Sequence, residues 1–269
     1  FETIRYETLE PGIGVITLAR PAKLNTLTGT MLREIDDAVG EAERDDGVRV
    51  LVLTGAPRPD GRPCFSAGVD VKSFEAGDGV TTEGGFALTN RIDDLLKPTV
   101  AVVDGVCSTG GLELALACDL RIVGAGAQIS DWHLKKLGTG LGAWGGATRL
   151  ARLLGVQRAK EIILTGKVVS GDGALRIGFA SELHPSAELW ERALATVRAI
   201  AGMDPRGLRL TLAHLDRIDD MTRDQALRWA QLAPDWLGGI AGEAPDNQGR
   251  GLAGKETGTA AGGSARGLL

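Results

Sequence analysis

The 269-residue chain is short of several features that mark whole classes of protein. Its net charge is −5, and it has no basic segment interleaved with aromatic residues, which make up only 4% of the chain. This composition argues against nucleic acid or an anionic membrane as a partner. No apolar run approaches the ~20 residues of a membrane span, and no charged-then-apolar leader opens the chain. We therefore expect a cytoplasmic protein.

Cysteine is also scarce. The three residues of this type, Cys64, Cys107 and Cys118, are odd in number and lack metal-ligand spacing. This pattern predicts no metal site and fits a reducing compartment. Buried free cysteine usually behaves as a small hydrophobe, so we expect these side chains to pack rather than react.

Glycine is abundant, with 39 residues, and two glycine-bearing segments predict chemistry. They cover residues 64–70 and 108–114. The second follows the apolar run 99–103, which predicts a buried strand, and a helix is predicted to begin near Gly110. The first N–H groups of a helix have no intrahelical partner and lie at the positive end of the helix dipole. Because each segment can aim a backbone N–H at one small anion, together they predict an oxyanion hole.

Glu113 follows Gly110 by roughly one helical turn, in a stretch that is apolar nearly all round. A carboxylate near a developing oxyanion suits proton transfer beside an enolate. Two interpretations remain open. Glu113 is either a catalytic group in a desolvated site or a structural carboxylate satisfied by hydrogen bonds.

Apolar strand-like runs alternate with helical patterns, which predicts an α/β fold with βα units around a buried sheet. After Leu183 the pattern becomes helical. The Gly- and Thr-rich segment 75–85 is predicted to be mobile, as a substrate lid or a plain surface loop. The expected strands are 15–18, 48–54, 99–103 and 120–123, and the expected helices are 31–43, 86–96, 187–203, 205–215 and 222–232.

Composition divides the chain into three regions. We expect a core over residues 1–184, a helical region over 185–241 and a flexible tail over 242–269. The tail is rich in Gly, Ala, Thr and Ser and cannot bury a core.

Several motifs between Val15 and Leu183 together resemble the crotonase (enoyl-CoA hydratase/isomerase) superfamily, and as an ordered set they are far more specific than a lone glycine string. The resemblance implies a crotonase-like (ββα)-type superhelix core. It also implies that the C-terminal helices cover the active site and build a homotrimer or homohexamer. The motifs are 14–21 with 23–25, 46–55, 67–70, 105 with 110–115, 118–119, 145–146 with 149–150, and 159–161 with 164–166.

Members of this superfamily bind an acyl-CoA thioester and hold its carbonyl oxygen with two backbone N–H groups. By position these are the amides of Val69 and Gly110, and Glu113 matches the first of two catalytic glutamates. The resemblance thus implies a lyase of fatty acid metabolism, an enoyl-CoA hydratase with no cofactor beyond the coenzyme A of its substrate. Alternatives are a CoA-thioester hydrolase or isomerase on the same fold, or a non-catalytic homologue that acts by assembly or RNA binding.

The chain departs from the family pattern where the second glutamate is expected, because residues 129–138 contain none. Counting forward from the preceding strand places His133 on the missing acid, whereas counting back from the following glycine pair places Lys135 there. An imidazole titrates near ~6.5, so His133 can serve as a general acid or base, and Asp131 is a second candidate. His133 could instead simply hydrogen-bond the loop. For Lys135 and Lys136 a solvated face is the favoured interpretation.

Coenzyme A is anionic and must meet local positive charge, for which Arg20, Lys23 and Lys72 are candidates, although each also fits an ordinary surface charge. Trp132 and Trp144 either line the acyl pocket or pack in the core. The other expected substrate contacts, all within the matched motifs, are Leu24, Ala67, Gly68, Asp70 and Gly111.

Overall fold

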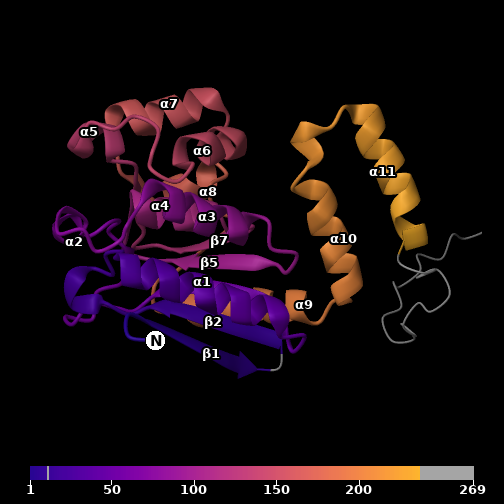
Figure 1. Cartoon of the computed structure of the whole chain (residues 1–269), viewed down its shortest axis with the longest axis horizontal. Helices are drawn as coiled ribbons and strands as arrows, with labels where there is room; N and C mark the ends of the chain where they lie inside the picture. Colours follow the sequence, from indigo (N-terminus) through magenta and orange to yellow (C-terminus); the bar gives the residue numbers. More distant parts are fainter. Residues whose placement is uncertain (11, 237–269) are drawn as a thin grey trace, which may run out of the picture.

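The computed structural model describes residues 1–10 and 12–236, so the predicted tail 242–269 lies outside the described residues. This part of the chain forms two β-sheets with helices packed around them (Figure 1). The larger sheet contains β1 (Ile4–Glu10), β2 (Gly12–Leu18), β3 (Val48–Gly55), β5 (Thr99–Val103), β7 (Leu120–Gly124) and β10 (Glu182–His184) in that order. The smaller contains β4 (Cys64–Ser66), β6 (Val106–Ser108), β8 (Gln128–Ser130) and β9 (Val169–Ser170).

Consecutive strands divide between the two sheets. β3, β5 and β7 lie in the larger sheet, while β4, β6 and β8, which follow them in sequence, lie in the smaller. Neighbours are parallel except at two edges, where β1 pairs with β2 and β9 pairs with β8 in antiparallel fashion. The fold is therefore the crotonase-like (ββα) arrangement that the resemblance implied.

The larger sheet is buried on both faces, because side chains of successive strand residues point to opposite sides. Ile13 and Val15 of β2 pack with α9 (Leu189–Ala201), whereas Ile16 and Leu18 pack with α1 (Gly29–Arg44) and α4 (Gly110–Leu116). Helix α9 thus lies on the face of the larger sheet opposite α4.

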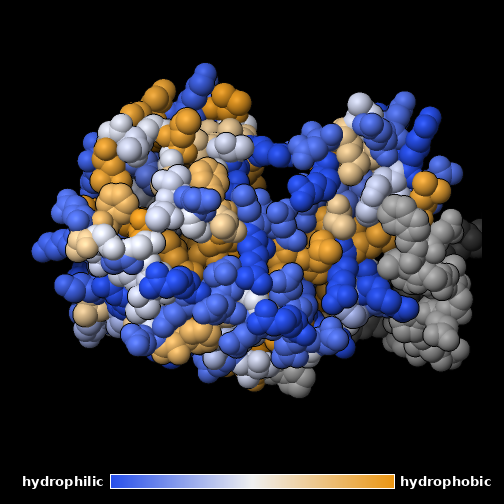
Figure 2. Space-filling view, viewed as in Figure 1, coloured by the Kyte–Doolittle hydropathy of each residue, from blue (hydrophilic) through white to orange (hydrophobic). Residues whose placement is uncertain are grey.

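The other helices complete the core and a lateral hairpin. They are α2 (Val71–Glu75), α3 (Thr82–Asp93), α5 (His133–Leu137), α6 (Gly146–Leu154), α7 (Val156–Thr165), α8 (Gly171–Arg176), α10 (Pro205–Leu215) and α11 (Arg223–Trp236), with single 3-10 turns at Pro21–Lys23 and Ile218–Asp220. Helices α10 and α11 stand beside the core in Figure 1, and the space-filling view shows a notch between them and the lobe formed by α5, α6 and α7 (Figure 2). Within the described residues, every helix is too short or too polar to cross a membrane.

Most predicted elements lie within observed ones, but the predicted loop 75–85 is wrong in extent. Glu75 ends α2, and Thr82 already begins α3. The side chain of Thr81 accepts a hydrogen bond from the Gly84 N–H at 2.9 Å and so caps this helix start. Only residues 76–81 connect the two helices.

Candidate active site

Three parallel strands of the smaller sheet have their carboxyl ends on the same side, and the segment after each carries predicted site residues. Val69 follows β4, Gly110 follows β6 and Asp131 follows β8. The carboxyl ends of parallel strands are where α/β sheets commonly bind ligands. The topology thus brings together segments that are distant in sequence.

The two glycine-bearing segments are in direct contact. Gly68 has φ +97°, and a Cβ on it would lie 1.7 Å from the hydroxyl oxygen of Thr109, so no larger residue fits. That hydroxyl is 3.4 Å from the carbonyl oxygen of Ala67, to which it donates. A Cβ on Gly111 would similarly lie 2.7 Å from the carbonyl oxygen of Ser66. Glycine is therefore required here for close approach.

Backbone N–H groups at this contact are open. Thr109 adopts φ 47° and ψ −119°, a strained conformation for a β-branched residue, and its side chain does not cap α4. Leu27 pairs with the carbonyl of Gly68 and the N–H of Asp70, on either side of Val69. Within residues 1–10 and 12–236, neither the Val69 N–H nor the Gly110 N–H has an acceptor. Two donors are thus left for an anion.

The Glu113 side chain is only 1% exposed, and its two oxygens differ. Oε1 accepts hydrogen bonds from the N–H groups of Trp144 at 2.7 Å and Gly146 at 3.0 Å. Oε2 is buried with no hydrogen-bond partner. Burial raises the pKa of Glu113 from its ordinary 4.5, although the two N–H groups and the charge of His133 oppose this. A purely structural carboxylate would have both oxygens satisfied.

His133 lies opposite that unpaired oxygen. Its Nε2 is 3.5 Å from Glu113 Oε2, and its Nδ1 is 3.1 Å from Asp131 Oδ1. The same Asp131 oxygen accepts the His133 backbone N–H at 2.9 Å. Burial alone would lower the pKa of His133, but the hydrogen bond to Asp131 and the charge of Glu113 outweigh it and raise the pKa above 6.5. The three predicted catalytic side chains therefore form one buried chain from Asp131 through His133 to Glu113.

The lysines of the same loop lie elsewhere. Lys135 and Lys136 are exposed, and the ammonium of Lys136 lies 3.5 Å from the ring centre of Trp132. Of the two ways of counting, the one that selects His133 thus gives the residue that faces Glu113. Trp132 is half-buried, and its Nε1 donates to the carbonyl oxygen of Gly166 at 3.0 Å.

The candidate substrate-binding residues divide into two kinds. Arg20 pairs with Asp70 at 3.0 Å and also donates to the carbonyl oxygen of Thr26 at 2.6 Å, so its charge is already matched internally. Leu24, in the left-handed region with φ 54°, accepts the Ala67 N–H at 3.0 Å through its carbonyl. These residues join the turn after β2 to the first glycine-bearing segment. Lys23 and Lys72 are exposed and make no ion pair within the described residues.

Sequence reasoning missed Asn25, which is fully buried with φ 50°. Its side chain accepts the Arg20 N–H at 3.0 Å and donates to the carbonyl oxygens of Ala56 at 2.8 Å and Cys64 at 3.0 Å. Asparagine tolerates the left-handed region better than most residues, which is the only local signal for this role. Asn25 thereby joins the two sheets beneath the site.

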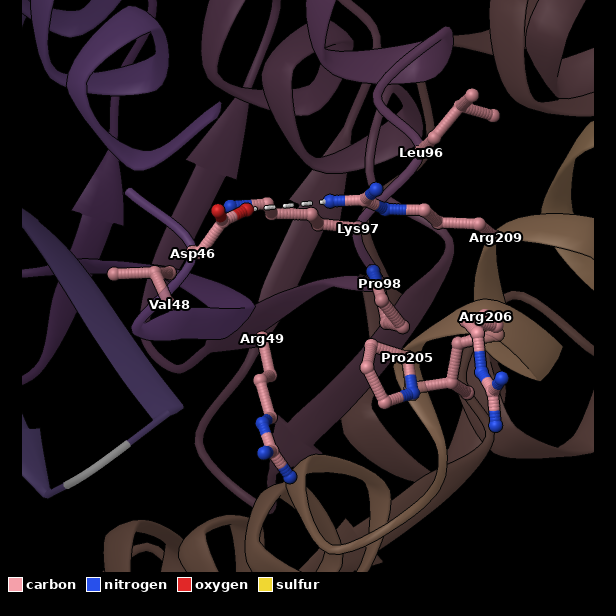
Figure 3. Close-up of a pocket in the computed structure, with 10 residues that line it drawn as sticks. Asp46, Val48, Arg49, Leu96, Lys97, Pro98, Pro205, Arg206 and Arg209 are labelled. Atoms are coloured by element: carbon pink, nitrogen blue, oxygen red, sulfur yellow. Dashed lines mark ion pairs between the residues drawn. The ribbon is translucent and has the colours of Figure 1, made fainter. Parts of the chain in front are cut away.

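A pocket of about 210 Å³ opens elsewhere, at the amino ends of β3 and β5 where α10 begins (Figure 3). Arg209 lies 3.7 Å from Asp46 across it, and the buried Lys97 donates to the carbonyl oxygens of Ala42 and Asp45 at 2.7 Å each. No predicted site residue lines this pocket. It lies at the amino ends of its strands, whereas the predicted site residues follow the carboxyl ends of β4, β6 and β8.

Comparison with known proteins gives the family. A family model described as enoyl-CoA hydratase/isomerase matches residues 8–231. The chain belongs to this family. The short-chain-enoyl-CoA hydratase of Clostridium acetobutylicum is 33% identical over 225 residues, covering 81% of this chain and 83% of that relative.

Solved structures of the enoyl-CoA hydratase/isomerase family share the fold. An enoyl-CoA hydratase from Bacillus anthracis superposes with a TM-score of 0.80 at 29% identity, covering 89% of this chain and 91% of that one. An enoyl-CoA hydratase from Thermoplasma volcanium superposes with a TM-score of 0.78 at 26% identity, covering 88% of this chain and 92% of that one. The predicted superfamily and fold class are confirmed.

Proposed function

We propose that this protein is a lyase that adds water to a 2-enoyl-CoA thioester, or removes it from the corresponding 3-hydroxyacyl thioester. One observation carries the proposal. Oε2 of Glu113, which has no hydrogen-bond partner, faces the imidazole of His133 at 3.5 Å in a buried site, one helical turn from the open N–H of Gly110. The similarity to proteins named enoyl-CoA hydratases supports it.

The N–H groups of Val69 and Gly110 would bind the thioester carbonyl oxygen. When water attacks the β-carbon, the electron pair of the double bond moves toward this oxygen, which becomes an enolate. Fixed donors aimed at the developing charge stabilise it without reorganisation, and loss of one such donor typically costs about 3 kcal/mol. The strained Thr109, which directs the first turn of α4, fits such a preorganised arrangement.

The proton transfers fall to Glu113 and His133. With Oε1 held by two N–H groups, Oε2 takes a proton from water as the water oxygen bonds to the β-carbon. The imidazolium of His133 then gives its Nε2 proton to the α-carbon of the enolate, and the raised pKa of His133 favours this charged form. Glu113 ends protonated and His133 neutral. Transfer of one proton across the 3.5 Å between them restores both.

Asp131 is proposed to position rather than to react. Its oxygen binds both the ring and the backbone N–H of His133, which fixes the ring with Nε2 toward Glu113 and stabilises the imidazolium. The proposed reaction consists of C–O bond formation at the β-carbon and proton transfers, and it needs no cofactor beyond the coenzyme A carried by the substrate. Lys23 and Lys72 are proposed to meet its phosphates.

Mixing the protein with crotonyl-CoA tests this function. The expected product is 3-hydroxybutyryl-CoA, seen as loss of the absorbance of the conjugated thioester. Substitutions Glu113→Gln and His133→Gln should each lower kcat by about 10²–10⁴-fold, as expected for loss of a general acid or base. Lys135→Ala, an exposed change on the same short helix as His133, should leave kcat unaltered.

Two other products would contradict the proposal in different ways. Release of free coenzyme A would identify a thioester hydrolase, and a shifted double bond would identify an isomerase. Absence of any reaction with an enoyl-CoA, together with no retention on immobilised coenzyme A, would favour the non-catalytic alternative.

We also propose that the protein is a cytoplasmic enzyme of fatty acid metabolism and assembles as a homotrimer or homohexamer. The hairpin formed by α10 and α11 stands beside the core (Figure 1), and its exposed large apolar side chains support assembly. Those residues are Leu215, Ile218, Leu227 and Leu232.

A further inference from the structure

A large buried ring packs against the start of α4, the helix that carries Gly110 and Glu113. Trp144 is 1% exposed, and its indole occupies the space between Gly85 of α3 and Gly110 of α4. A Cβ on Gly110 would lie 2.8 Å from the ring atom Cζ3, and a Cβ on Gly85 would lie 1.9 Å from Nε1. The indole therefore touches helix backbone on both sides, where only glycine leaves room.

The main chain of Trp144 is held as firmly as its ring. Its N–H donates to Glu113 Oε1 at 2.7 Å, and its carbonyl oxygen accepts from Thr89 Oγ1 at 3.0 Å and from Arg149 at 2.9 Å. Arg149 is in turn paired with Asp93 at 3.0 Å. The ring cannot withdraw by a shift of its loop without breaking the bond that fixes Glu113.

This placement matters for the acyl chain. In the proposed reaction the thioester oxygen lies at the Gly110 N–H and the β-carbon lies beside Glu113 Oε2. The chain beyond the β-carbon must then leave through the space next to these two residues. Trp144 contacts both of them, Gly110 with its ring and Glu113 with its N–H.

We infer that Trp144 limits the length of the acyl chain, so that short 2-enoyl groups fit and long ones collide with the indole. This inference rests on the proposed function, because it uses the same oxyanion donors and the same Glu113. Gly85 also contributes to this limit, because a side chain at this position would push the indole toward Gly110.

The first test compares kcat/KM for crotonyl-CoA and trans-2-dodecenoyl-CoA in the native protein and in Trp144→Phe. The native protein should favour the short substrate, and the smaller ring should shift the ratio toward the long one by about tenfold or more, the range expected when a hydrophobic pocket changes by a few carbon atoms. A change by the same factor for both substrates would show that Trp144 only supports the fold, and would overturn the inference.

The second test uses Gly85→Ala, whose new methyl group must push the indole toward Gly110. This variant should lower kcat/KM for crotonyl-CoA by about tenfold or more, and adding Trp144→Phe should restore it, because phenylalanine lacks the Nε1 edge. Gly207→Ala in α10, a helical glycine with open space around it, is the matched control and should change nothing. Failure of Trp144→Phe to rescue folded Gly85→Ala, as judged by circular dichroism, would overturn the inference.

Binding separates this inference from the proposed function. Calorimetry with the saturated butyryl-CoA and dodecanoyl-CoA needs no turnover. Tighter binding of butyryl-CoA that Trp144→Phe reverses, without hydration of any enoyl-CoA, would contradict the hydratase proposal and leave length selection standing. Hydration of crotonyl-CoA together with equal affinity for both saturated thioesters would support the hydratase proposal and contradict length selection by Trp144.

Discussion

Glu113 places a carboxylate where folding alone would not favour one. One oxygen is held by two backbone N–H groups, while the other is buried with no hydrogen-bond partner. An unsatisfied buried polar atom costs about 1–3 kcal/mol. A residue retained at that cost is typical of a functional site, where stability is given up for chemistry.

Substitution Glu113→Gln should therefore stabilise the protein while lowering activity. The amide keeps an oxygen for the N–H groups of Trp144 and Gly146 and removes the buried charge. We expect the free energy of unfolding at neutral pH to rise by about 1–3 kcal/mol. Thermal unfolding followed by circular dichroism measures this.

The difference in unfolding free energy between Glu113→Gln and the native protein should depend on pH, and the pKa shift of Glu113 gives its sign. Because the pKa of Glu113 is raised in the folded protein, the fold keeps this proton where the unfolded chain has lost it, so native stability falls as pH rises from 4.5 through the folded-state pKa. The advantage of Glu113→Gln should grow across that interval. An advantage that shrank with rising pH would contradict the raised pKa.

At the scale of elements, the site depends on strands that sequence patterns barely reveal. β4, β6 and β8 have three residues each, too few for alternation to register, whereas β5 matches the predicted run 99–103 residue for residue. Glycine patterns and a lone acid in an apolar stretch are local signals, and they mark the predicted site segments after β4 and β6. The segment after β8 carries no such signal and was predicted only from the family resemblance. The contact between His133 and Glu113 depends on the tertiary fold. Counting along the sequence therefore left His133 and Lys135 as alternatives.

Asn25 shows the same limit and gives a prediction. Substitution Asn25→Ala leaves the carbonyl oxygens of Ala56 and Cys64 without this donor and places alanine at φ 50°. We expect a loss of about 2–4 kcal/mol in the free energy of unfolding, measured by urea denaturation. Gln157→Ala on the exposed side of α7 is the control, with an expected change below about 0.5 kcal/mol. Equal effects of the two would show that Asn25 does not join the sheets.

At the scale of the whole molecule, the larger sheet separates the site from α9, and the hairpin of α10 and α11 stands to one side (Figure 1). The hairpin meets the core through ion pairs, with Arg217 at 2.7 Å from Asp94 and Arg152 at 3.4 Å from Asp219. Periodicity predicted these helices well but not their positions, because an apolar helix face does not specify which surface covers it.

Light scattering on the protein as it elutes from a size-exclusion column should give a molar mass three or six times the 28.1-kDa mass of the chain. Substituting both Leu227→Glu and Leu232→Glu in α11 should lower the mass toward that of one chain, because charge replaces exposed apolar surface. Gln231→Glu, an exposed change between them, should leave the mass intact. A single-chain mass for the native protein would contradict the proposed assembly.

The proposed oxyanion hole should polarise the carbonyl of a bound thioester through two backbone N–H groups, those of Val69 and Gly110. Isotope-edited difference infrared spectroscopy measures this directly, with crotonyl-CoA carrying ¹³C at the carbonyl and with Glu113→Gln to slow turnover. We expect a clear shift of the carbonyl stretch to lower frequency on binding. A frequency unchanged from that of the free thioester in water, with the ligand shown to be bound, would contradict it.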